Sequence, residues 1–191
     1  DLCQALRVVR ATDWLSTVGV ALDGQDTVYL GMSLGAILGS ILSAIEPTLQ
    51  TLALNVGGAD LVEMMQHSTL FKPMLDMTLR QKNLVEGTEA YQQFVSLARW
   101  ALDPVDPINF VQHTLREPSR PNEVMLPTKR VLLQMSQGDL IVPNSATELL
   151  ATRMGTSLSV YHPLVSNPGF LFDPTSFEGA RARDEIVAFF D

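Results

Sequence analysis

One stretch of the chain decides its fold: Val28-Tyr29-Leu30-Gly31-Met32-Ser33-Leu34-Gly35-Ala36. Residues 27–30 combine branched, aromatic and apolar side chains, a pattern typical of a short buried strand. Residues 36–45 are apolar or small, which predicts a helix that ends at Glu46-Pro47 because the residue before a proline leaves the helical region. The segment between them, residues 31–35, matches G-x-S-x-G in the strand-to-helix setting that this motif requires.

The motif gives Ser33 a chemical role. A serine at so sharp a turn needs unusual backbone angles, so we predict a positive φ at Ser33. Small flanking residues let the strand and the helix approach closely. The backbone N–H of Leu34, at the helix N-terminus, would stabilise a developing oxyanion. Ser33 is therefore a candidate nucleophile, and the alternative is a glycine-rich turn that only packs tightly.

Strands and helices alternate over the rest of the chain. Further strands are predicted at residues 52–56, 130–135 and 157–161, and further helices at residues 1–17, 144–153 and 177–190. Asn144 or Ser145 is the predicted N-cap of the helix at 144–153. This alternation predicts the α/β class, with a parallel sheet covered by helices on both faces.

Residues 59–122 form a block too long for a simple crossover between two strands. Its helical patterns fall at residues 61–66, 73–80 and 89–102, and residues 117–122 are predicted to form a return loop. We therefore predict a helical lid, 59–122, inserted between two parts of the core, 1–58 and 123–191. Four methionines at helical spacing are predicted to pack in the lid core or to line an apolar pocket: Met64, Met65, Met74 and Met77.

Two residues are candidate partners for Ser33. Gly138-Asp139 follows the predicted strand at 130–135, at the sheet edge where α/β sites form, and a carboxylate there can orient a catalytic imidazole. The chain order Ser…Asp…His then needs a histidine after Asp139, and only His162 qualifies. The alternatives are a turn aspartate and a solvent-facing histidine at the end of a strand.

Composition excludes several other functions. The 21 acidic residues outnumber the 13 basic ones, and the formal net charge is −8. The sequence contains no Lys/Arg cluster, so it lacks the basic patch that nucleic-acid-binding proteins usually have. The one cysteine, Cys3, and the absence of metal-ligand spacing argue against a metal site. No Walker or G-x-G-x-x-G motif occurs, and no apolar run reaches bilayer length.

Four stretches resemble the carboxyl-terminal half of an α/β-hydrolase, in particular bacterial lipases and esterases: residues 28–39, Leu54-Asn55-Val56-Gly57-Gly58, residues 132–143 and Gly169-Phe170-Leu171-Phe172. The resemblance implies a serine ester hydrolase with Ser33 as nucleophile, Asp139 as triad acid and the Leu34 N–H as an oxyanion donor. It implies an apolar ester substrate, no cofactor, and a secreted or cell-surface bacterial protein.

The resemblance has two departures. The family's histidine normally stands just before a Gly-Phe pair, where this chain has Asn167-Pro168, so either a rearranged loop brings in His162 or the triad is incomplete. Only about four of the usual eight strands are predicted. We therefore expect an upstream segment before Asp1, a second chain or a homo-oligomer to cover the exposed sheet edge. The alternative function is an impaired hydrolase-like fragment that binds a ligand or partner.

Overall fold

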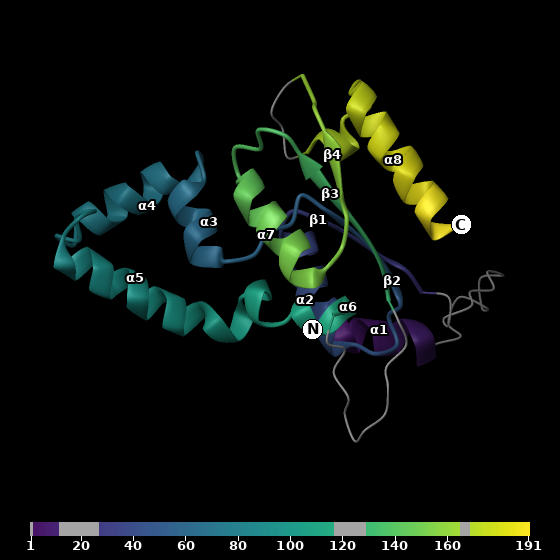
Figure 1. Ribbon diagram of the computed structural model, residues 1–191, viewed down its shortest axis with the longest axis horizontal. Helices are drawn as coiled ribbons and strands as arrows, with labels where there is room; N and C mark the ends of the chain where they lie inside the picture. Colours follow the sequence, from purple (N-terminus) through teal and green to yellow (C-terminus); the bar gives the residue numbers. More distant parts are fainter. Residues whose placement is uncertain (1, 12–26, 117–128, 165–168) are drawn as a thin grey trace.

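The computed structural model describes residues 2–11, 27–116, 129–164 and 169–191 (Figure 1). The predicted helix residues 12–17 and the predicted return loop 117–122 lie outside these ranges. The described elements, in chain order, are α1 (Leu2–Ala11), β1 (Tyr29–Met32), α2 (Leu34–Ile45), β2 (Thr51–Asn55), α3 (Leu61–His67), α4 (Phe71–Arg80), α5 (Glu89–Leu102), η2 (Asp103–Val105), η3 (Pro107–Asn109), α6 (Gln112–Leu115), β3 (Arg130–Ser136), α7 (Asn144–Met154), β4 (Leu158–Tyr161), η5 (Phe170–Phe172) and α8 (Phe177–Phe190).

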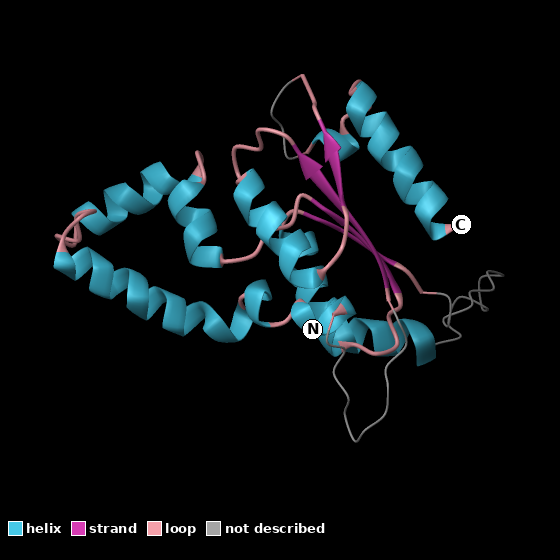
Figure 2. Cartoon of the chain, viewed as in Figure 1, coloured by secondary structure: helices cyan, strands magenta, loops and turns pink. Residues whose placement is uncertain are grey.

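The four described strands form one parallel sheet in the order β1-β2-β3-β4, which confirms the predicted α/β class. Helices α2 and α7 pack on one face, and α8 packs on the other (Figure 2). Alternate residues of β2 divide between the faces, because Leu52 and Leu54 join the α2/α7 core whereas Ala53 joins the α8 core. Both faces of the sheet are therefore covered, as the apolar strands require.

Strand β1 extends two residues beyond the predicted strand. Gly31 and Met32 continue the parallel ladder opposite Leu54 and Asn55. A glycine so close to a serine motif favours a turn locally, but pairing with the neighbouring strand adds these two residues to the sheet. The helix that follows begins at Leu34, so Ser33 is the single residue between the strand and the helix.

A buried lysine binds the backbone that connects α2 to β2. The ammonium group of Lys129 donates to the carbonyl oxygens of Glu46 and Leu49, at the end of α2 and the start of β2. Burial lowers the pKa of Lys129 to about 8, although the nearby Glu46 charge opposes this shift. Lys129 thereby supplies hydrogen bonds to the carbonyl of the α2 C-cap and to a carbonyl of the connection that leads into β2.

The block between β2 and β3 is helical in its described part and projects from the sheet as α3, α4 and α5 (Figure 1). Arg99 of α5 donates to both carboxylate oxygens of Asp60, the N-cap of α3, at 2.8 and 2.7 Å. The buried Asp106 accepts from the backbone N–H of Asp60 and of Leu61. These bonds tie both ends of the projecting helices to one point.

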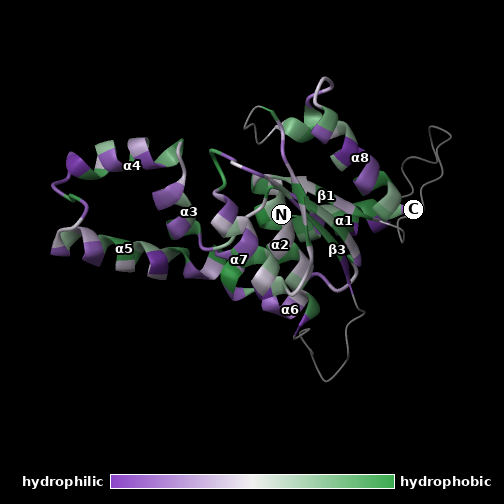
Figure 3. Ribbon diagram, turned by 45° about the horizontal axis from the view of Figure 1, so that its top comes forward, coloured by the Kyte–Doolittle hydropathy of each residue, from purple (hydrophilic) through white to green (hydrophobic). Residues whose placement is uncertain are grey.

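Polar and apolar residues alternate along α4 and α5 (Figure 3). The predicted packing of the methionines is correct only in part: Met64 is buried, but Met74 and Met77 are 63% and 62% exposed. Helix α4 is covered on one side only, so its other side keeps apolar residues in solvent. The turn before α4 contacts the loop after β3, since the Leu70 N–H donates to the Leu140 carbonyl at 3.2 Å.

The close approach of β1 and α2 predicts a sharp contrast between two glycines of one helix. A Cβ at residue 39 would overlap the Tyr29 ring and lie 2.9 Å from Leu54 Cδ2, whereas a Cβ at residue 35 would meet only the Tyr29 hydroxyl, at 3.9 Å. We expect Gly39→Ala to lower the free energy of unfolding by about 1–3 kcal/mol through overpacking. Urea denaturation of the matched Gly35→Ala variant should show unchanged or slightly higher stability; equal losses would contradict this packing.

Strand β1 is an edge strand of the described sheet, and its flanking apolar side chains are open to solvent. Val28 is 44% exposed and Leu30 is 45% exposed. Because an uncharged, apolar edge invites pairing, we expect another polypeptide segment to cover β1. Sedimentation velocity of these 191 residues should show self-association or aggregation. Replacing Leu30 by Lys should reduce that association, and a monodisperse monomer of the unmodified chain would contradict the expectation.

Candidate active site

Ser33 stands alone at the turn between β1 and α2, with φ 52° and ψ −116°. The predicted positive φ is therefore confirmed. Such a conformation costs about 1–3 kcal/mol in a non-glycine residue and persists only where the surroundings impose it. Here the Ser33 N–H donates to the Asn55 carbonyl at 2.9 Å, which holds the turn against β2. Although Ser33 is the N-cap residue of α2, its hydroxyl makes no hydrogen bond to the backbone N–H groups of the helix.

The glycine before the serine is required by sterics. A Cβ at Gly31 would lie 2.5 Å from the Gly35 carbonyl oxygen, and backbone cannot move aside cheaply. The Tyr29 hydroxyl donates to that same oxygen at 2.7 Å, which fixes the distance between strand and helix. The second glycine is different, because a Cβ at Gly35 has room. The expectation that close approach demands a small residue on both sides of Ser33 is thus correct for Gly31 only.

Leu34 is the first residue of α2, and its side chain is 65% exposed. The first four N–H groups of a helix have no partner within it, so the Leu34 N–H is available beside Ser33. The aligned peptide dipoles of α2 add partial positive charge at this point. The predicted role of this N–H as an oxyanion donor is chemically consistent with that position.

Asp139 lies in the loop after β3, at the same carboxyl edge of the sheet as Ser33, and is 8% exposed. Its Oδ1 accepts from the N–H of Ile141 at 2.8 Å and of Val142 at 3.0 Å. Its Oδ2 is buried and has no hydrogen-bond partner among the residues that the structure describes. Burial raises the pKa of this carboxyl, although the two backbone bonds act in the opposite direction. One oxygen is thus held and the other is left without a donor.

Asn144 positions the Asp139 loop, and this role was missed in the sequence. The predicted N-cap role of Asn144 or Ser145 is wrong: Pro143 occupies the cap and makes no side-chain cap bond. Instead, the Asn144 amide donates to the Ser136 carbonyl at 2.7 Å and accepts from the Gly138 N–H at 2.7 Å. An asparagine before a helix suggests a cap locally, whereas here it bridges the two sides of a loop.

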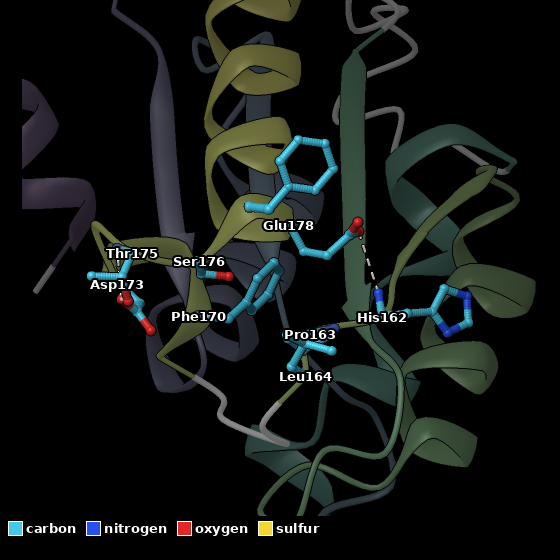
Figure 4. Close-up of a pocket in the computed structure, with 9 residues that line it drawn as sticks. His162, Pro163, Leu164, Phe170, Asp173, Thr175, Ser176 and Glu178 are labelled. Carbon is cyan, nitrogen blue, oxygen red and sulfur yellow. Dashed lines mark hydrogen bonds between the residues drawn. The ribbon is translucent and has the colours of Figure 1, made fainter.

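His162 directly follows β4, which pairs with β3, so the strands that precede His162 and Asp139 are neighbours in the sheet. Its side chain is exposed, and its backbone N–H lies 3.4 Å from Glu178 Oε2. The imidazole points away from Glu178 and the neighbouring pocket residues (Figure 4). It makes no hydrogen bond to Ser33, Asp139 or any other described residue. Asn167 and Pro168, which stand where the α/β-hydrolase resemblance would place the histidine, lie outside the described residues.

A buried polar network lies beneath this edge of the sheet. Asn55 donates to the Gln134 side chain at 2.9 Å, and Gln134 donates to Glu185 of α8 at 2.7 Å. Tyr161 and Ser159 also donate to Glu185, at 2.6 and 2.7 Å. These bonds hold the pKa of Glu185 low although burial opposes them, and burial and Glu185 raise the pKa of Tyr161. Polar residues within apolar strands, such as Asn55 and Gln134, were the available sequence signal.

Two other histidines lie in the helical block, away from these residues. His67 pairs with Glu63 on α3, and His113 lies beside Gln112 on α6. In the part of the chain that the structure describes, no three His, Cys, Asp or Glu side chains gather as metal ligands do. None of the described helices has both the length and the apolar character to span a bilayer.

The unpaired Asp139 oxygen predicts a pH dependence of stability. A carboxyl whose pKa is higher in the folded state than its unfolded value of about 3.9 binds more protons when folded. Its stabilising contribution is therefore present at low pH and is lost as pH rises through the folded-state pKa. Asp139→Asn keeps an acceptor for Ile141 and Val142 but removes the charge. We expect the variant to gain stability relative to the parent as pH rises above about 4, measured by urea denaturation at several pH values; parallel curves would contradict this.

Several solved structures share the fold of this chain. No protein-family model and no curated protein matches the sequence. Among solved structures, a puromycin-hydrolysing peptidase of Mycobacterium tuberculosis is 14% identical, with a TM-score of 0.55 over 97% of this chain and 24% of its own. A candidate dienelactone hydrolase of Klebsiella pneumoniae is 10% identical, with a TM-score of 0.52 over 98% of this chain and 59% of its own.

A third similar structure is an acylaminoacyl peptidase of Pyrococcus horikoshii, 11% identical, with a TM-score of 0.53 over 97% of this chain and 28% of its own. The chain thus spans between about a quarter and three fifths of these proteins. At such low identity the likeness concerns the fold and not the activity. With its four parallel strands and flanking helices, the chain has a partial α/β-hydrolase fold.

Proposed function

We propose that this chain is a serine hydrolase of carboxylic esters with an apolar acyl group. The observation that carries the proposal is the backbone of Ser33, whose φ of 52° places at a strand-to-helix turn a serine whose hydroxyl makes no cap bond to the helix. Asp139 supports it, because a buried carboxylate with one oxygen lacking a donor suits the N–H of an imidazole. The hydrolases among the similar structures are compatible with this reaction class.

The reaction would proceed in two stages. Ser33 Oγ attacks the acyl carbon while its proton passes to a histidine, and the oxyanion of the tetrahedral intermediate accepts from the Leu34 N–H. The intermediate expels the alcohol, which takes that proton, and leaves an acyl group on Ser33. Water then attacks the acyl carbon and gives its proton to the histidine. Collapse of the second intermediate releases the acid, and the histidine returns its proton to Ser33 Oγ, which restores the enzyme. No cofactor is required.

His162 is the candidate base, and its position also favours a second function. Proton transfer needs a base within about 2.6–3.2 Å of the serine oxygen, and the exposed His162 imidazole bonds to neither Ser33 nor Asp139. The second candidate is therefore a catalytically impaired hydrolase-like chain that binds a ligand or partner. The peptidases among the similar structures add peptides to the substrates that an activity panel should include. Thioesters belong in the panel as well, because a serine nucleophile can attack them by the same acyl-transfer chemistry.

Labelling by a fluorophosphonate separates the two functions, since only an activated serine reacts readily. We expect mass spectrometry to find the label on Ser33, and Ser33→Ala to lose it together with hydrolysis of p-nitrophenyl butyrate, a loss of at least about a thousandfold. Ser96→Ala, at an exposed serine of α5, should keep both. A folded chain that takes no label and cleaves none of the esters, peptides or thioesters is the binding protein of the second proposal.

The identity of the base has its own test. Because the His162 imidazole is not hydrogen-bonded to Ser33 or Asp139, we expect His162→Ala to leave residual ester hydrolysis unchanged. Adding free imidazole should raise the rate by supplying a base for Ser33, and Asp139→Asn should reduce that gain. Pro168→His, which restores a histidine before Gly169-Phe170, should also raise the rate. A large loss in His162→Ala would instead show that His162 moves to Ser33 during catalysis.

A further inference from the structure

One peptide group joins the projecting helices to the candidate active site. It links Leu140 to Ile141, in the loop that carries Asp139. Its N–H, on Ile141, donates to Asp139 Oδ1 at 2.8 Å. Its carbonyl oxygen, on Leu140, accepts from the Leu70 N–H at 3.2 Å and from the Ser68 hydroxyl at 3.3 Å. The carbonyl and the N–H of a trans peptide point in opposite directions, so the α3–α4 turn and the Asp139 carboxylate bind opposite sides of one planar group.

Ser68 is held in place for this contact. It is the C-cap residue of α3 and is fully buried. Its backbone N–H donates to the Met64 carbonyl at 2.9 Å, and its hydroxyl accepts from the Phe71 N–H at 3.2 Å. A hydroxyl has one proton, and the Leu140 carbonyl accepts it. A buried group whose hydrogen bonds are satisfied in this way is rigid, so it fixes the direction of its bond to the loop.

Apolar packing supports the same attachment. Met64 of α3 belongs to a buried cluster that also contains Val142 and Ala146, and Ile141 packs against this cluster. The Val142 N–H is the second donor to Asp139 Oδ1, at 3.0 Å. Both residues whose N–H groups hold the carboxylate therefore pack in a cluster that includes α3. The position of the carboxylate depends on the helical block as well as on β3 and α7.

We infer that Ser68 is a positioning residue for Asp139 and acts through the 140–141 peptide. The inference rests on the proposed function, because Asp139 has a histidine to orient only if Ser33 is the nucleophile. Without the Ser68 hydroxyl, the Leu140 carbonyl loses one of its two donors from the turn, and the peptide plane is less constrained. Rotation of that plane turns the Ile141 N–H away from Asp139, and a hydrogen bond weakens steeply as its angle departs from linear.

Amide hydrogen exchange of the full chain tests the attachment without an assay of activity. Ser68→Ala should accelerate exchange of the Ile141 N–H by about 3- to 10-fold, the value of one net hydrogen bond. Ser96→Ala makes the same substitution on α5, where the hydroxyl donates to Gln92 of its own helix, and should leave the Ile141 rate unchanged. Circular dichroism checks that both variants fold. Ser68→Cys, whose thiol is a weaker donor, replaces Ser68→Ala if that variant unfolds.

A double-mutant cycle separates positioning of Asp139 from general structural support. Ser68→Ala should slow the labelling of Ser33 by a fluorophosphonate by about 3- to 10-fold. The same substitution in an Asp139→Ala chain should cause no further slowing, because the carboxylate through which Ser68 acts is then absent. A residue that only supports the fold would slow labelling by the same factor in both chains.

Two results would overturn the inference. The first is an unchanged Ile141 exchange rate in folded Ser68→Ala, whatever the activity of the chain. The second is labelling that Ser68→Ala slows equally with and without the Asp139 carboxylate, or does not slow at all. Failure of the proposed function gives a different result: even the parent takes no label, while Ser68→Ala still accelerates exchange at Ile141. That result would reject the positioning role together with the hydrolysis and keep only the attachment of the turn to the loop.

Discussion

The contact between β1 and α2 sets the geometry on which the candidate site depends. Gly31 and Gly39 leave no room for a Cβ, and the Tyr29 ring lies between strand and helix with its hydroxyl on the Gly35 carbonyl. With strand and helix held this close, a single residue must reverse the chain, and Ser33 takes a positive φ to do so. The strain at Ser33 is thus maintained by packing on both sides and not by the serine itself.

Parallel pairing brings the second residue of the site to the same edge. Ser33 follows β1 and Asp139 follows β3, and β2 lies between them, so both residues leave the sheet at its carboxyl end. Asn144 then holds the Asp139 loop, and the buried bonds among Asn55, Gln134 and Glu185 join the strands below to α8. Among the described residues no donor reaches Asp139 Oδ2, and this hydrogen bond is the one that the histidine of the proposed hydrolase would supply.

The projecting helices are attached to the core near their base. They are tied to the core through Asp60, Arg99 and Asp106 near their base, and through Leu70 beside the Asp139 loop. Beyond those points α4 and α5 share little apolar surface with the sheet, so Met74 and Met77 remain exposed and the inner side chains border a small, half-open apolar pocket.

The amino-acid sequence by itself determined the α/β class, the positions of most helices and strands, and the unusual backbone of Ser33. These depend on side-chain periodicity and on sterics over a few neighbouring residues, which the sequence displays directly. Local pattern failed where a distant group decides the outcome: Asn144 reads as a helix cap but bridges Ser136 and Gly138, and Gly31 reads as a turn but pairs with Leu54. Only the tertiary structure decided that Asp139 Oδ2 is buried without a hydrogen-bond donor among the described residues, that the exposed His162 imidazole makes no hydrogen bond to it, and that α3, α4 and α5 border a half-open apolar pocket. The burial of Asp139, the position of the His162 side chain and the packing of α3 against α4 and α5 depend on contacts between segments far apart in the chain. A local sequence pattern does not encode such contacts.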